Sequence, residues 1–580
     1  MVHKSALILD RDQHSVMPPP RPVEAPRRRR RWLVALAVVA LLAAMAYAMI
    51  TTAVEQTPTF DEPVYVGTAV VYRQQHSLRY NPEHPPLGKL VIGVGTAFAE
   101  PRLDPAYSGN QAQVGRQLLY GSGNDPGRLM LFARLPIIVL TLLFGLVVFA
   151  FARDMTGAAA GPAAGAVGGL LALALYAFSP DVIAHGSLAT LDVPAAGFLL
   201  TSAWLLWRAR RRPWLYAPLA GLALGAALAT KSSALAAVPV LLPLVVLSVW
   251  HARRSRAPGG PSGSARALAL GVAAAAGVGV LAVAVVWASY LAVDPRLYWV
   301  TPDVVPAYDG MRGRLIGLLP FPQPYRDGVN IQFLYEDKAY PGFLLGRSYR
   351  GSLWYYLPVA LLIKTPLGAL VLWLAGTIAM LARRRLWPAV PYVLLPAGVL
   401  LAAVLYESRN FGVRYAIAVP MFLAVAAAGV VVLRSPWPRV TVAARVATAA
   451  LVLFVAASSA RAFPYYLPYS NEAFGGPAST HLHLHDSNVD WGQDLGRLAE
   501  HLRRRYPGEK VWLVYYGSGV PTHYGIGAAN PFTVPPDQVR GLLVVSDTRI
   551  AKADGRLLAL LDGAEPVDAV GHSITIFRRR

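Results

Sequence analysis

The residues best suited to chemistry stand in two short motifs that follow the first long apolar run of the chain. The first motif, TFDEP at 59–63, places the carboxylates of Asp61 and Glu62 side by side. The second, NPEHPPLGK at 81–89, ends a proline turn with Lys89. A lysine in the first turn of a helix makes a ready anion site, because free backbone N–H groups point outward there. The motifs therefore predict carboxylates and an anion site near one end of a membrane helix.

Both motifs also have a structural interpretation. Residues 59–63 suit the first turn of a helix, where a capping side chain, acidic residues and proline are all favourable. This capping interpretation accounts well for one carboxylate and adequately for two. Lys89 can equally lie at a membrane surface with only its ammonium group in water. Both interpretations stay open from these residues alone.

The chain around the motifs has the composition of a polytopic membrane protein. Its 580 residues are 55% hydrophobic and only 15% charged, which is too few charges to coat a soluble globule of that size. The net charge of +22 comes from short basic clusters beside apolar runs, unlike the continuous basic stripe of a nucleic-acid-binding protein. The absence of cysteine excludes disulfides, thiolate metal sites and cysteine nucleophiles.

Apolar runs long enough to cross a bilayer predict an α-helical polytopic protein of the plasma (inner) membrane, with about eleven spans of about 17 to 25 residues. Basic clusters fall at every second junction between the runs, so the positive-inside rule places the amino terminus in the cytoplasm. The predicted spans are 32–50, 130–151, 161–179, 193–207, 214–230, 234–250, 267–291, 353–381, 388–406, 412–433 and 440–462.

Three regions follow from this topology. Residues 1–31, rich in proline and arginine, are predicted to form a disordered basic cytoplasmic arm. Residues 32–462 form the membrane domain, with large outer loops at 51–128 and 292–352, and the second loop is long enough to cover a site. Residues 463–580 combine an amphipathic helix with short strands, which predicts a small extracytoplasmic α/β domain.

Further polar residues allow more than one interpretation. Asp192 is either a helix cap or a residue lining an aqueous site, because an unpaired carboxylate within the membrane costs about 2.5 to 3.5 kcal/mol. Lys231 and Lys364, near the ends of two spans, are expected to extend to the membrane surface unless they face a cavity. HLHLHD at 481–486 would place three histidines on one face of a strand, as a metal site or a polar strand edge.

The motifs resemble one family. FDE at 60–62 followed by HPPLGK at 84–89 is similar to the first outer loop of the dolichyl-phosphate-mannose protein O-mannosyltransferases. More broadly, it resembles the polyprenyl-phosphate-dependent glycosyltransferases of the GT-C fold, which include the lipid A aminoarabinose transferases. Three further stretches agree in order, AHGSLATLDVPAAGFLL at 184–200, GLALGAALATKSSAL at 221–235 and RYAIAVP at 414–420. The β-trefoil module of the eukaryotic members is missing, which leaves the acceptor class open.

The resemblance implies a glycosyltransferase that moves a sugar, with inversion, from a polyprenyl monophosphate to an extracytoplasmic hydroxyl or amine. Asp61 matches the family's catalytic aspartate and is expected to act as general base, a contribution of about 10² to 10⁴ in rate. Lys89 is expected to stabilise the departing phosphate, with Arg414 as a second candidate. The other expected substrate-binding residues are Glu62, His84 and Asp192.

This chemistry requires no cofactor or metal ion, and a divalent ion at the outer site is compatible with it. The expected partners are the bilayer, the polyprenyl-phosphate-linked sugar and a protein, glycan or lipid acceptor, and nucleic acid is not among them. One alternative is a lipid or sugar transporter or flippase, whose buried charges would lie near the membrane midplane. Another is a non-catalytic membrane scaffold, which would tolerate loss of Asp61. The clustering of charges at the outer ends of spans favours the enzyme.

Overall fold

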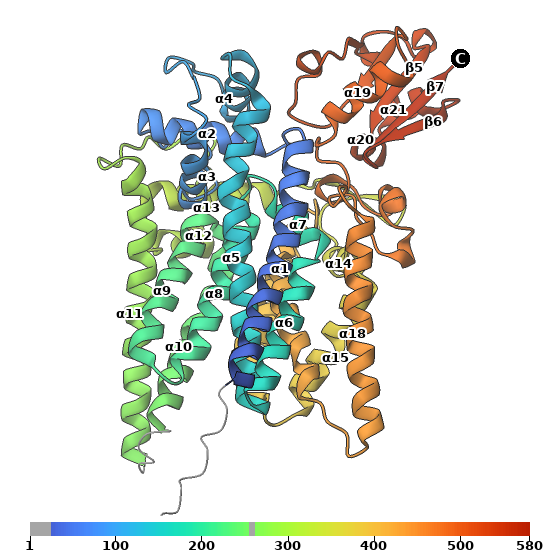
Figure 1. Ribbon diagram of the computed structural model, residues 1–580. Helices are drawn as coiled ribbons and strands as arrows, with labels where there is room; N and C mark the ends of the chain where they lie inside the picture. Colours follow the sequence, from blue (N-terminus) through green and yellow to red (C-terminus); the bar gives the residue numbers. More distant parts are fainter. Residues whose placement is uncertain (1–24, 255–260) are drawn as a thin grey trace, which may run out of the picture.

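The membrane part of the protein is a bundle of long helices in the computed structural model, which describes residues 25–254 and 261–580 (Figure 1). Within these residues, seven helices are long and apolar enough to cross a membrane, or nine if each of two bent pairs is one span. The seven are formed by α1 (Ala25–Glu55), α5 (Pro126–Ala160), α9 (Pro213–Thr230), α10 (Val238–Arg254), α11 (Pro261–Val293), α16 (Val390–Val404) and α18 (Pro438–Arg461).

The sequence predicts about eleven spans; by length and composition, seven to nine helices of the described residues can cross a membrane, and every predicted run is helical. Two runs are bent at prolines, which cannot continue a helix without losing a hydrogen bond. The axes of their two halves differ by 63° and 117°. The bent pairs are α6 (Pro162–Ala177) with α7 (Pro180–Gly186), and α14 (Tyr356–Lys364) with α15 (Leu367–Ala382). The last two runs form α8 (Asp192–Ala209), and α17 (Ala418–Ala427) with the 3₁₀ turn η5 (Ala428–Val432).

Helix α1 begins at Ala25, inside the stretch 1–31 that was predicted as a disordered arm. Arginine and alanine are good helix formers, so the arginine run continues the apolar helix that follows it. The rest of the predicted arm, 1–24, lies outside the described residues.

The predicted outer loops fold into short elements around one end of the bundle, the upper end in Figure 1. The first loop contains α2 (Glu62–Gln75), α3 (Leu87–Ala97), α4 (Gln111–Arg116) and the π-helical turn η1 (Gln117–Gly121). The second loop contains α12 (Gly310–Gly317), α13 (Gln323–Glu336) and an antiparallel hairpin of β1 (Pro341–Leu344) and β2 (Arg347–Arg350).

The carboxy-terminal region is the expected small α/β domain, and it sits above the bundle in Figure 1. Its five-stranded sheet has the order β4-β3-β5-β7-β6, with β3 parallel to β4 and β5, and β7 antiparallel to β5 and β6. The strands are β3 (Val511–Val514), β4 (Ala528–Ala529), β5 (Gly541–Ser546), β6 (Glu565–Val570) and β7 (Ile574–Arg579). The helices are α19 (Leu495–Arg505), α20 (Asp547–Ala551) and α21 (Gly555–Leu561).

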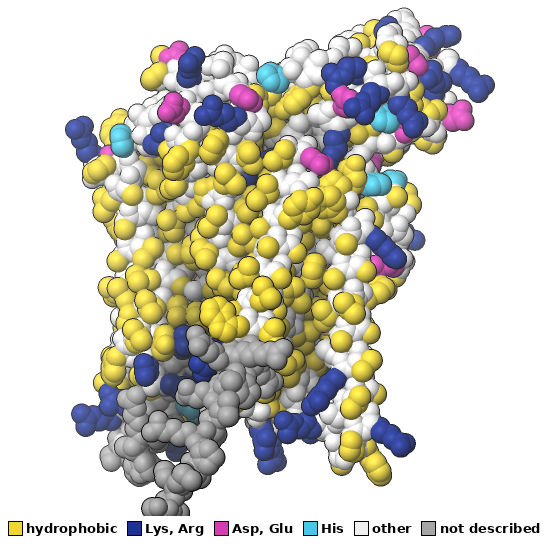
Figure 2. Space-filling model, viewed as in Figure 1, with side chains coloured by type: hydrophobic (Ala, Val, Ile, Leu, Met, Phe, Trp, Pro, Cys, Tyr) yellow, Lys and Arg dark blue, Asp and Glu magenta, His cyan; other side chains and the backbone are white. Residues whose placement is uncertain are grey.

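Apolar side chains cover the middle of the bundle on the face that Figure 2 shows, and charged side chains gather at its two ends. Leu36 on α1, Val280 on α11 and Leu453 on α18 are among the exposed apolar residues. In water, such surface costs about 25 cal/mol per Å², whereas in a bilayer it contacts lipid. The protein is therefore an integral membrane protein.

Candidate active site

A cavity of about 600 Å³, here called the outer cavity, lies where the helix ends meet the outer loops and the carboxy-terminal region. Charged side chains line one part of it. The other part is apolar and extends into the bundle, because Leu199 lies about two helical turns beyond Asp192 and Leu400 about two turns before Glu407. The outer cavity thus joins a polar entrance to an apolar passage between α8 and α16.

Four side chains form the charge cluster of the outer cavity: Asp61, Asp192, Lys231 and Arg414. Arg414 Nη1 donates to Asp61 Oδ2 at 2.8 Å and lies 3.8 Å from Asp192 Oδ2. Lys231 Nζ donates to Asp192 Oδ1. Three of these residues were expected at the substrate site, and the structure brings them together. Lys231 was expected at the membrane surface and instead faces the cavity.

An aromatic ring from the carboxy-terminal region supports Arg414. The guanidinium carbon lies 4.3 Å from the centre of the fully buried Trp491 ring, a distance suited to a cation–π contact. Trp491 is tied to the Asp61 loop, because Phe60 N donates to Trp491 O at 2.8 Å. Arg414 Nε is buried and has no hydrogen-bond partner among the described residues. Arg414 therefore keeps a donor for an incoming anion.

Asp61 is the most accessible acid of the charge cluster, with 27% of its side chain exposed. It precedes α2 as the N-cap residue but makes no side-chain capping bond, so capping does not occupy its carboxylate. Burial raises the pKa of Asp61 above its ordinary value, although neighbouring Arg414 acts in the opposite direction. A carboxylate with a raised pKa is a better general base near neutral pH.

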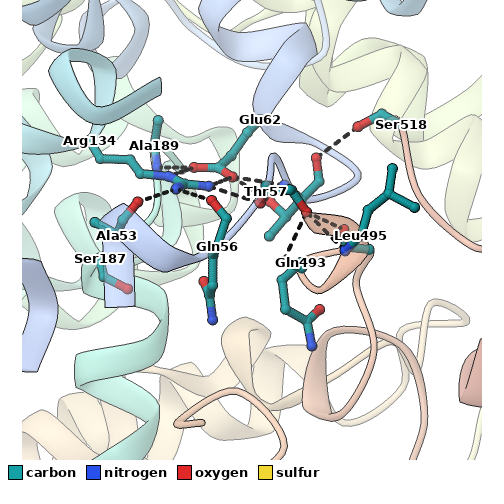
Figure 3. Close-up of polar contacts among 12 residues, drawn as sticks. Ala53, Gln56, Thr57, Glu62, Arg134, Ser187, Ala189, Gln493, Leu495 and Ser518 are labelled. Atoms are coloured by element: carbon teal, nitrogen blue, oxygen red, sulfur yellow. Dashed lines mark hydrogen bonds and ion pairs between the residues drawn. The ribbon is translucent and has the colours of Figure 1, made fainter. Parts of the chain in front are cut away.

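Glu62 does not line the outer cavity and instead joins a network of polar contacts called here the buried knot (Figure 3). Its Oε1 accepts from Arg134 Nε and Ala189 N, each at 2.8 Å. Its Oε2 accepts from Arg134 Nη2 at 2.7 Å, and from Thr59 N and Oγ1 at 2.9 and 3.0 Å. Both charged side chains are 0% exposed. This corrects the expectation that Glu62 contacts substrate, because its oxygens are already occupied.

The buried knot joins distant segments of the chain. Arg134 Nη1 donates to Ala53 O at 2.6 Å and to Gln56 O at 2.8 Å, and Arg134 Nη2 reaches Thr57 O at 3.2 Å. Thr57 Oγ1 in turn donates to Gln493 O at 2.9 Å in the carboxy-terminal region (Figure 3). Burial alone would raise the pKa of Glu62, but Arg134 and the surrounding N–H donors hold it below its ordinary value.

Lys89 also lies outside the lining of the outer cavity. Its Nζ donates to Asn81 O at 2.8 Å, Asn81 Oδ1 at 3.1 Å and His84 O at 2.6 Å. The side chain is fully buried, and an ammonium group has three donors, so all of them are used. The expectation that Lys89 stabilises a departing phosphate is corrected by this geometry: the lysine holds the proline turn together.

The turn that Lys89 holds presents His84 to the outer cavity, where it was expected. His84 Nδ1 is buried without a hydrogen-bond partner among the described residues. Burial, with the nearby cations Lys231 and Lys89, lowers the pKa of His84 well below its ordinary value. The ring is therefore neutral at pH 7 and able to accept or donate one hydrogen bond to a ligand.

A second polar group lines the cavity and was missed from the sequence. Arg409 Nε donates to Glu336 Oε1 at 2.5 Å, and Arg409 Nη2 donates to Gln332 Oε1 at 2.8 Å. Glu407 Oε2 has no partner among the described residues, and burial, with Glu336 nearby, raises the pKa of Glu407 to about 7. The sequence held one signal for these residues: the charges of YESRN at 406–410 come directly after an apolar run.

The carboxy-terminal region also supplies the outer wall of the cavity. The ring of Tyr516 stacks on Phe60, with centres 5.3 Å apart and planes 13° apart. Tyr516 OH donates to Asp486 Oδ2 at 2.7 Å, and Lys552 Nζ donates to the same oxygen at 2.9 Å. Nothing in the local sequence of these residues indicated that they would reach a site built from residues far earlier in the chain.

Two lesser expectations are also corrected. HLHLHD at 481–486 ends the 3₁₀ turn η7 (Pro477–Leu482) and continues as a loop, so its histidines do not share a strand face. Within residues 25–254 and 261–580, no three His, Cys, Asp or Glu side chains gather closely enough to hold a metal ion. Lys364 is 1% exposed and donates to Leu467 O at 2.6 Å and Asn488 O at 3.0 Å, so it does not reach a membrane surface.

Comparison with protein families supports the resemblance seen in the motifs. Residues 35–293 match the model of the family described as dolichyl-phosphate-mannose-protein mannosyltransferase. The chain therefore resembles this family over a region that includes Asp61, Lys89, Asp192 and Lys231. The search of curated proteins found no match.

Several solved structures are similar to this chain, including the following three. ArnT from Cupriavidus metallidurans bound to undecaprenyl phosphate is 16% identical, with a TM-score of 0.46 and coverage of 93% of this chain and 97% of that chain. The Saccharomyces cerevisiae protein O-mannosyltransferase Pmt1-Pmt2 complex bound to the sugar donor is 15% identical, with a TM-score of 0.34 and coverage of 45% and 34%. The oligosaccharyltransferase AglB from Archaeoglobus fulgidus, in complex with an inhibitory peptide and a dolichol-phosphate, is 11% identical, with a TM-score of 0.40 and coverage of 88% and 69%.

Proposed function

We propose that this chain is a membrane glycosyltransferase that moves a sugar, with inversion, from a polyprenyl monophosphate carrier to an extracytoplasmic acceptor. The observation that carries the proposal is the outer cavity, which joins the charge cluster to an apolar passage between helices. A prenyl chain needs apolar walls, a phosphate needs cations, and an acceptor hydroxyl needs a base. All three requirements meet at this cavity, and the family match over 35–293 supports the same class of enzyme.

Lys231 and Arg414 bind the phosphate of the carrier in this proposal, in place of Lys89. Both cations face the outer cavity, and before the donor binds they are paired with Asp192 and Asp61. Cations already held where negative charge grows stabilise the transition state without reorganisation. The apolar passage beside Leu199 and Leu400 receives the first part of the prenyl chain.

Asp61 acts as the general base. The acceptor oxygen attacks the anomeric carbon of the sugar, the bond from that carbon to the phosphate oxygen breaks, and Asp61 takes the acceptor proton. The phosphate competes with Asp61 for Arg414, so donor binding frees the carboxylate for this step. Glu62 cannot replace Asp61, because both of its oxygens are occupied in the buried knot.

The orientation of the proposed enzyme follows from the basic flanks of its spans, which place the amino terminus in the cytoplasm of a cell with a plasma (inner) membrane. The carboxy-terminal domain then lies outside, above the outer cavity. Asp486 and Tyr516 border the cavity from that side, so the acceptor enters beneath this domain. Its hydroxyl or amine belongs to a protein, a glycan or a lipid.

Transfer of radiolabelled sugar tests the proposal. Detergent-purified protein is incubated with a panel of polyprenyl-phosphate hexoses and pentoses and a membrane extract as acceptor, beside Asp61→Asn and the control Asp303→Asn, an exposed outer-loop acid. We expect transfer by the parent and the control, and at least about a hundredfold loss in Asp61→Asn. Undiminished turnover in Asp61→Asn would reject this base, and failure of every donor with the parent would reject the function.

A further inference from the structure

A second cavity, of about 500 Å³, is lined by the corner between α5 and α6 and by four arginines, Arg383, Arg384, Arg385 and Arg434. It is here called the basic cavity. It lies at the opposite end of the bundle from the outer cavity, because α17 with η5 (Ala418–Val432) crosses the bundle between Arg414, which lines the outer cavity, and Arg434, which lines the basic cavity. The two cavities therefore face opposite membrane surfaces.

The four arginines bring charge to this cavity without a counter-charge. All four side chains are exposed. The side chains of Arg383, Arg385 and Arg434 have no hydrogen bond, ion pair or ring contact with any described residue. Arg384 has a ring contact alone, 5.8 Å from the centre of Trp387. Figure 2 likewise shows dark blue but no magenta at the lower end of the bundle on the face in view.

Other arginines at the same end of the bundle are held by the protein. Arg208 Nε lies 3.3 Å from Asp154 Oδ2 and its guanidinium lies 4.8 Å from the Tyr216 ring centre. Arg210 lies 4.3 Å from the Trp207 ring centre, and Arg254 lies 4.7 Å from that of Trp250. The positive-inside rule explains why arginines occupy this end. Arg153 and Arg439 are also exposed, with no side-chain partner among the described residues, so what distinguishes the group of four is that it lines a cavity.

One backbone feature at the basic cavity favours an anion, although the carbonyl end of α5, at Ala159 and Ala160, also lines the cavity. Helix α6 begins at Pro162, and its N-cap residue Gly161 lines the cavity with φ of 91°, no capping side-chain hydrogen bond and open space where a Cβ would lie. The first N–H groups of a helix and its dipole attract negative charge. This helix terminus and the arginines come from three separate segments, and they converge on one space.

We propose that the basic cavity is a binding site for a phosphate-bearing anion, with the headgroup of an anionic phospholipid as its ligand. Arginine forms paired hydrogen bonds to phosphate oxygens, and binding such a group relieves the mutual repulsion of four clustered cations. The cavity lies at the end of the apolar surface of the bundle, where lipid headgroups are found, and basic pockets between helices on this side of a membrane hold such headgroups. The proposal is independent of the chemistry assigned to the outer cavity.

Native mass spectrometry of the full chain tests the site. Delipidated protein is titrated with phosphatidylglycerol or, for comparison, uncharged phosphatidylcholine. The test variant is Arg383→Gln/Arg434→Gln. The control Arg153→Gln/Arg439→Gln removes the same charge from exposed arginines that do not line the cavity. We expect the parent and the control to bind one phosphatidylglycerol tightly, and the test variant to bind it about thirtyfold more weakly.

Equal phosphatidylglycerol binding by the test variant and the control would overturn the proposal, and so would equal affinity of the parent for the two lipids. The variant Arg383→Lys/Arg434→Lys keeps the charge, and we expect it to recover most of the binding, which separates loss of the site from loss of folding. Calorimetric titration with inorganic phosphate distinguishes the source of the anion. In one outcome the parent binds inorganic phosphate but not phosphatidylglycerol, and phosphate binding is lost in the test variant. That result would support the anion site but overturn its assignment to a lipid.

Discussion

Asp61 and Glu62 are consecutive residues, yet they belong to two regions of opposite character, the charge cluster and the buried knot. Glu62 accepts five hydrogen bonds, and Arg134 donates to the remaining oxygens around it. Asp61 has a partly exposed carboxylate, and its partner Arg414 keeps a buried Nε without a partner. The two ion pairs look alike in a list of charges. They differ in how much hydrogen-bonding capacity is left for a ligand.

This difference separates a scaffold from a site. A buried ion pair whose every donor and acceptor is used fixes three segments of chain and offers nothing to a substrate. An ion pair with free capacity can exchange partners when a phosphate arrives. Removing one partner of a buried pair leaves an uncompensated charge and costs about 3 to 5 kcal/mol, so each region has its own experimental signature.

The largest expected effect is a difference in stability between variants of Glu62 and of Asp61. Glu62→Gln should lower the free energy of unfolding by about 3 to 5 kcal/mol, because Arg134 is left buried without a counter-charge. Asp61→Asn should lower it by less than about 1 kcal/mol, because its ion pair is partly exposed. The midpoint of thermal unfolding in detergent measures both changes. An equal fall for the two variants would erase the distinction between the regions.

The matched control for this prediction is the double variant Glu62→Gln/Arg134→Gln. It removes both charges of the buried knot and should recover part of the stability that Glu62→Gln loses, because no unpaired buried charge remains. Stability that falls further, by the sum of the two single substitutions, would contradict the account of the knot as a charge-compensated pair.

Glu407 allows a further comparison through pH, because it is a half-buried acid whose buried Oε2 has no hydrogen-bond partner among the described residues, unlike the oxygens of Glu62. Its pKa of about 7 exceeds the ordinary value of 4.5, so between these pH values the folded protein holds a proton that the unfolded chain releases. Its contribution to stability therefore falls as pH rises through this window, by up to about 3 kcal/mol. The pKa of Glu62 is lowered, so its contribution is instead lost as pH falls through the lowered pKa.

Thermal unfolding of the parent and Glu407→Gln between pH 4.5 and pH 7 measures the effect of Glu407. Glutamine cannot titrate, so the variant should lose the part of the pH slope that Glu407 supplies. Identical slopes for the two proteins would mean that Glu407 ionises normally in the folded state.

Lys231 and Lys89 extend the same comparison, between a residue with capacity for a ligand and a residue held by the backbone, to donor binding. Lys231→Gln should raise the KM for the lipid-linked sugar about tenfold or more, because under the proposed function it removes a charged hydrogen bond to the donor phosphate. Lys89→Gln should leave that KM nearly unchanged and lower the unfolding midpoint, since the hydrogen bonds of Lys89 go to Asn81 and His84 and its ammonium lies over the Tyr72 ring, all outside any phosphate contact. Initial rates over a range of donor concentrations measure both. A matching rise in KM for Lys89→Gln would restore Lys89 as a phosphate ligand.

The sequence predicted the fold class and part of the site for physical reasons that the structure clarifies. Apolar runs and their basic flanks reflect the bilayer, so each predicted run is helical. The number of full spans was harder to predict. It depends on the bends at Pro180 and Pro366 and on the short length of α17, which tertiary packing decides. Asp61, His84, Asp192 and Arg414, which were predicted as catalytic or substrate-binding residues, line one cavity.

The misassigned residues share one cause. Sequence motifs identify charged residues but not the direction of their side chains, and direction decides whether Glu62 and Lys89 meet a ligand or the backbone. Two of the missed residues, Trp491 and Tyr516, reach the cavity from positions more than 400 residues after Asp61. Such a contact leaves no local pattern of spacing or periodicity.

The smallest expected effect tests whether the carboxy-terminal region positions the charge cluster. Trp491→Phe should weaken the cation–π contact under Arg414 by about 1 kcal/mol and lower kcat/KM several-fold. Arg414 lowers the pKa of Asp61, so a less well held guanidinium should let that pKa rise, and the acidic limb of the pH profile of kcat/KM should move to higher pH.

Trp512→Phe is the matched control, because Trp512 is also buried and lies 4.3 Å from a cation, Lys510, but does not line the outer cavity. Both variants should lose some stability, and only Trp491→Phe should move the limb, because only its ring contacts a partner of the base. A limb that stays in place in Trp491→Phe would reduce Trp491 to a packing residue, and the charge cluster would then be organised by the membrane domain alone.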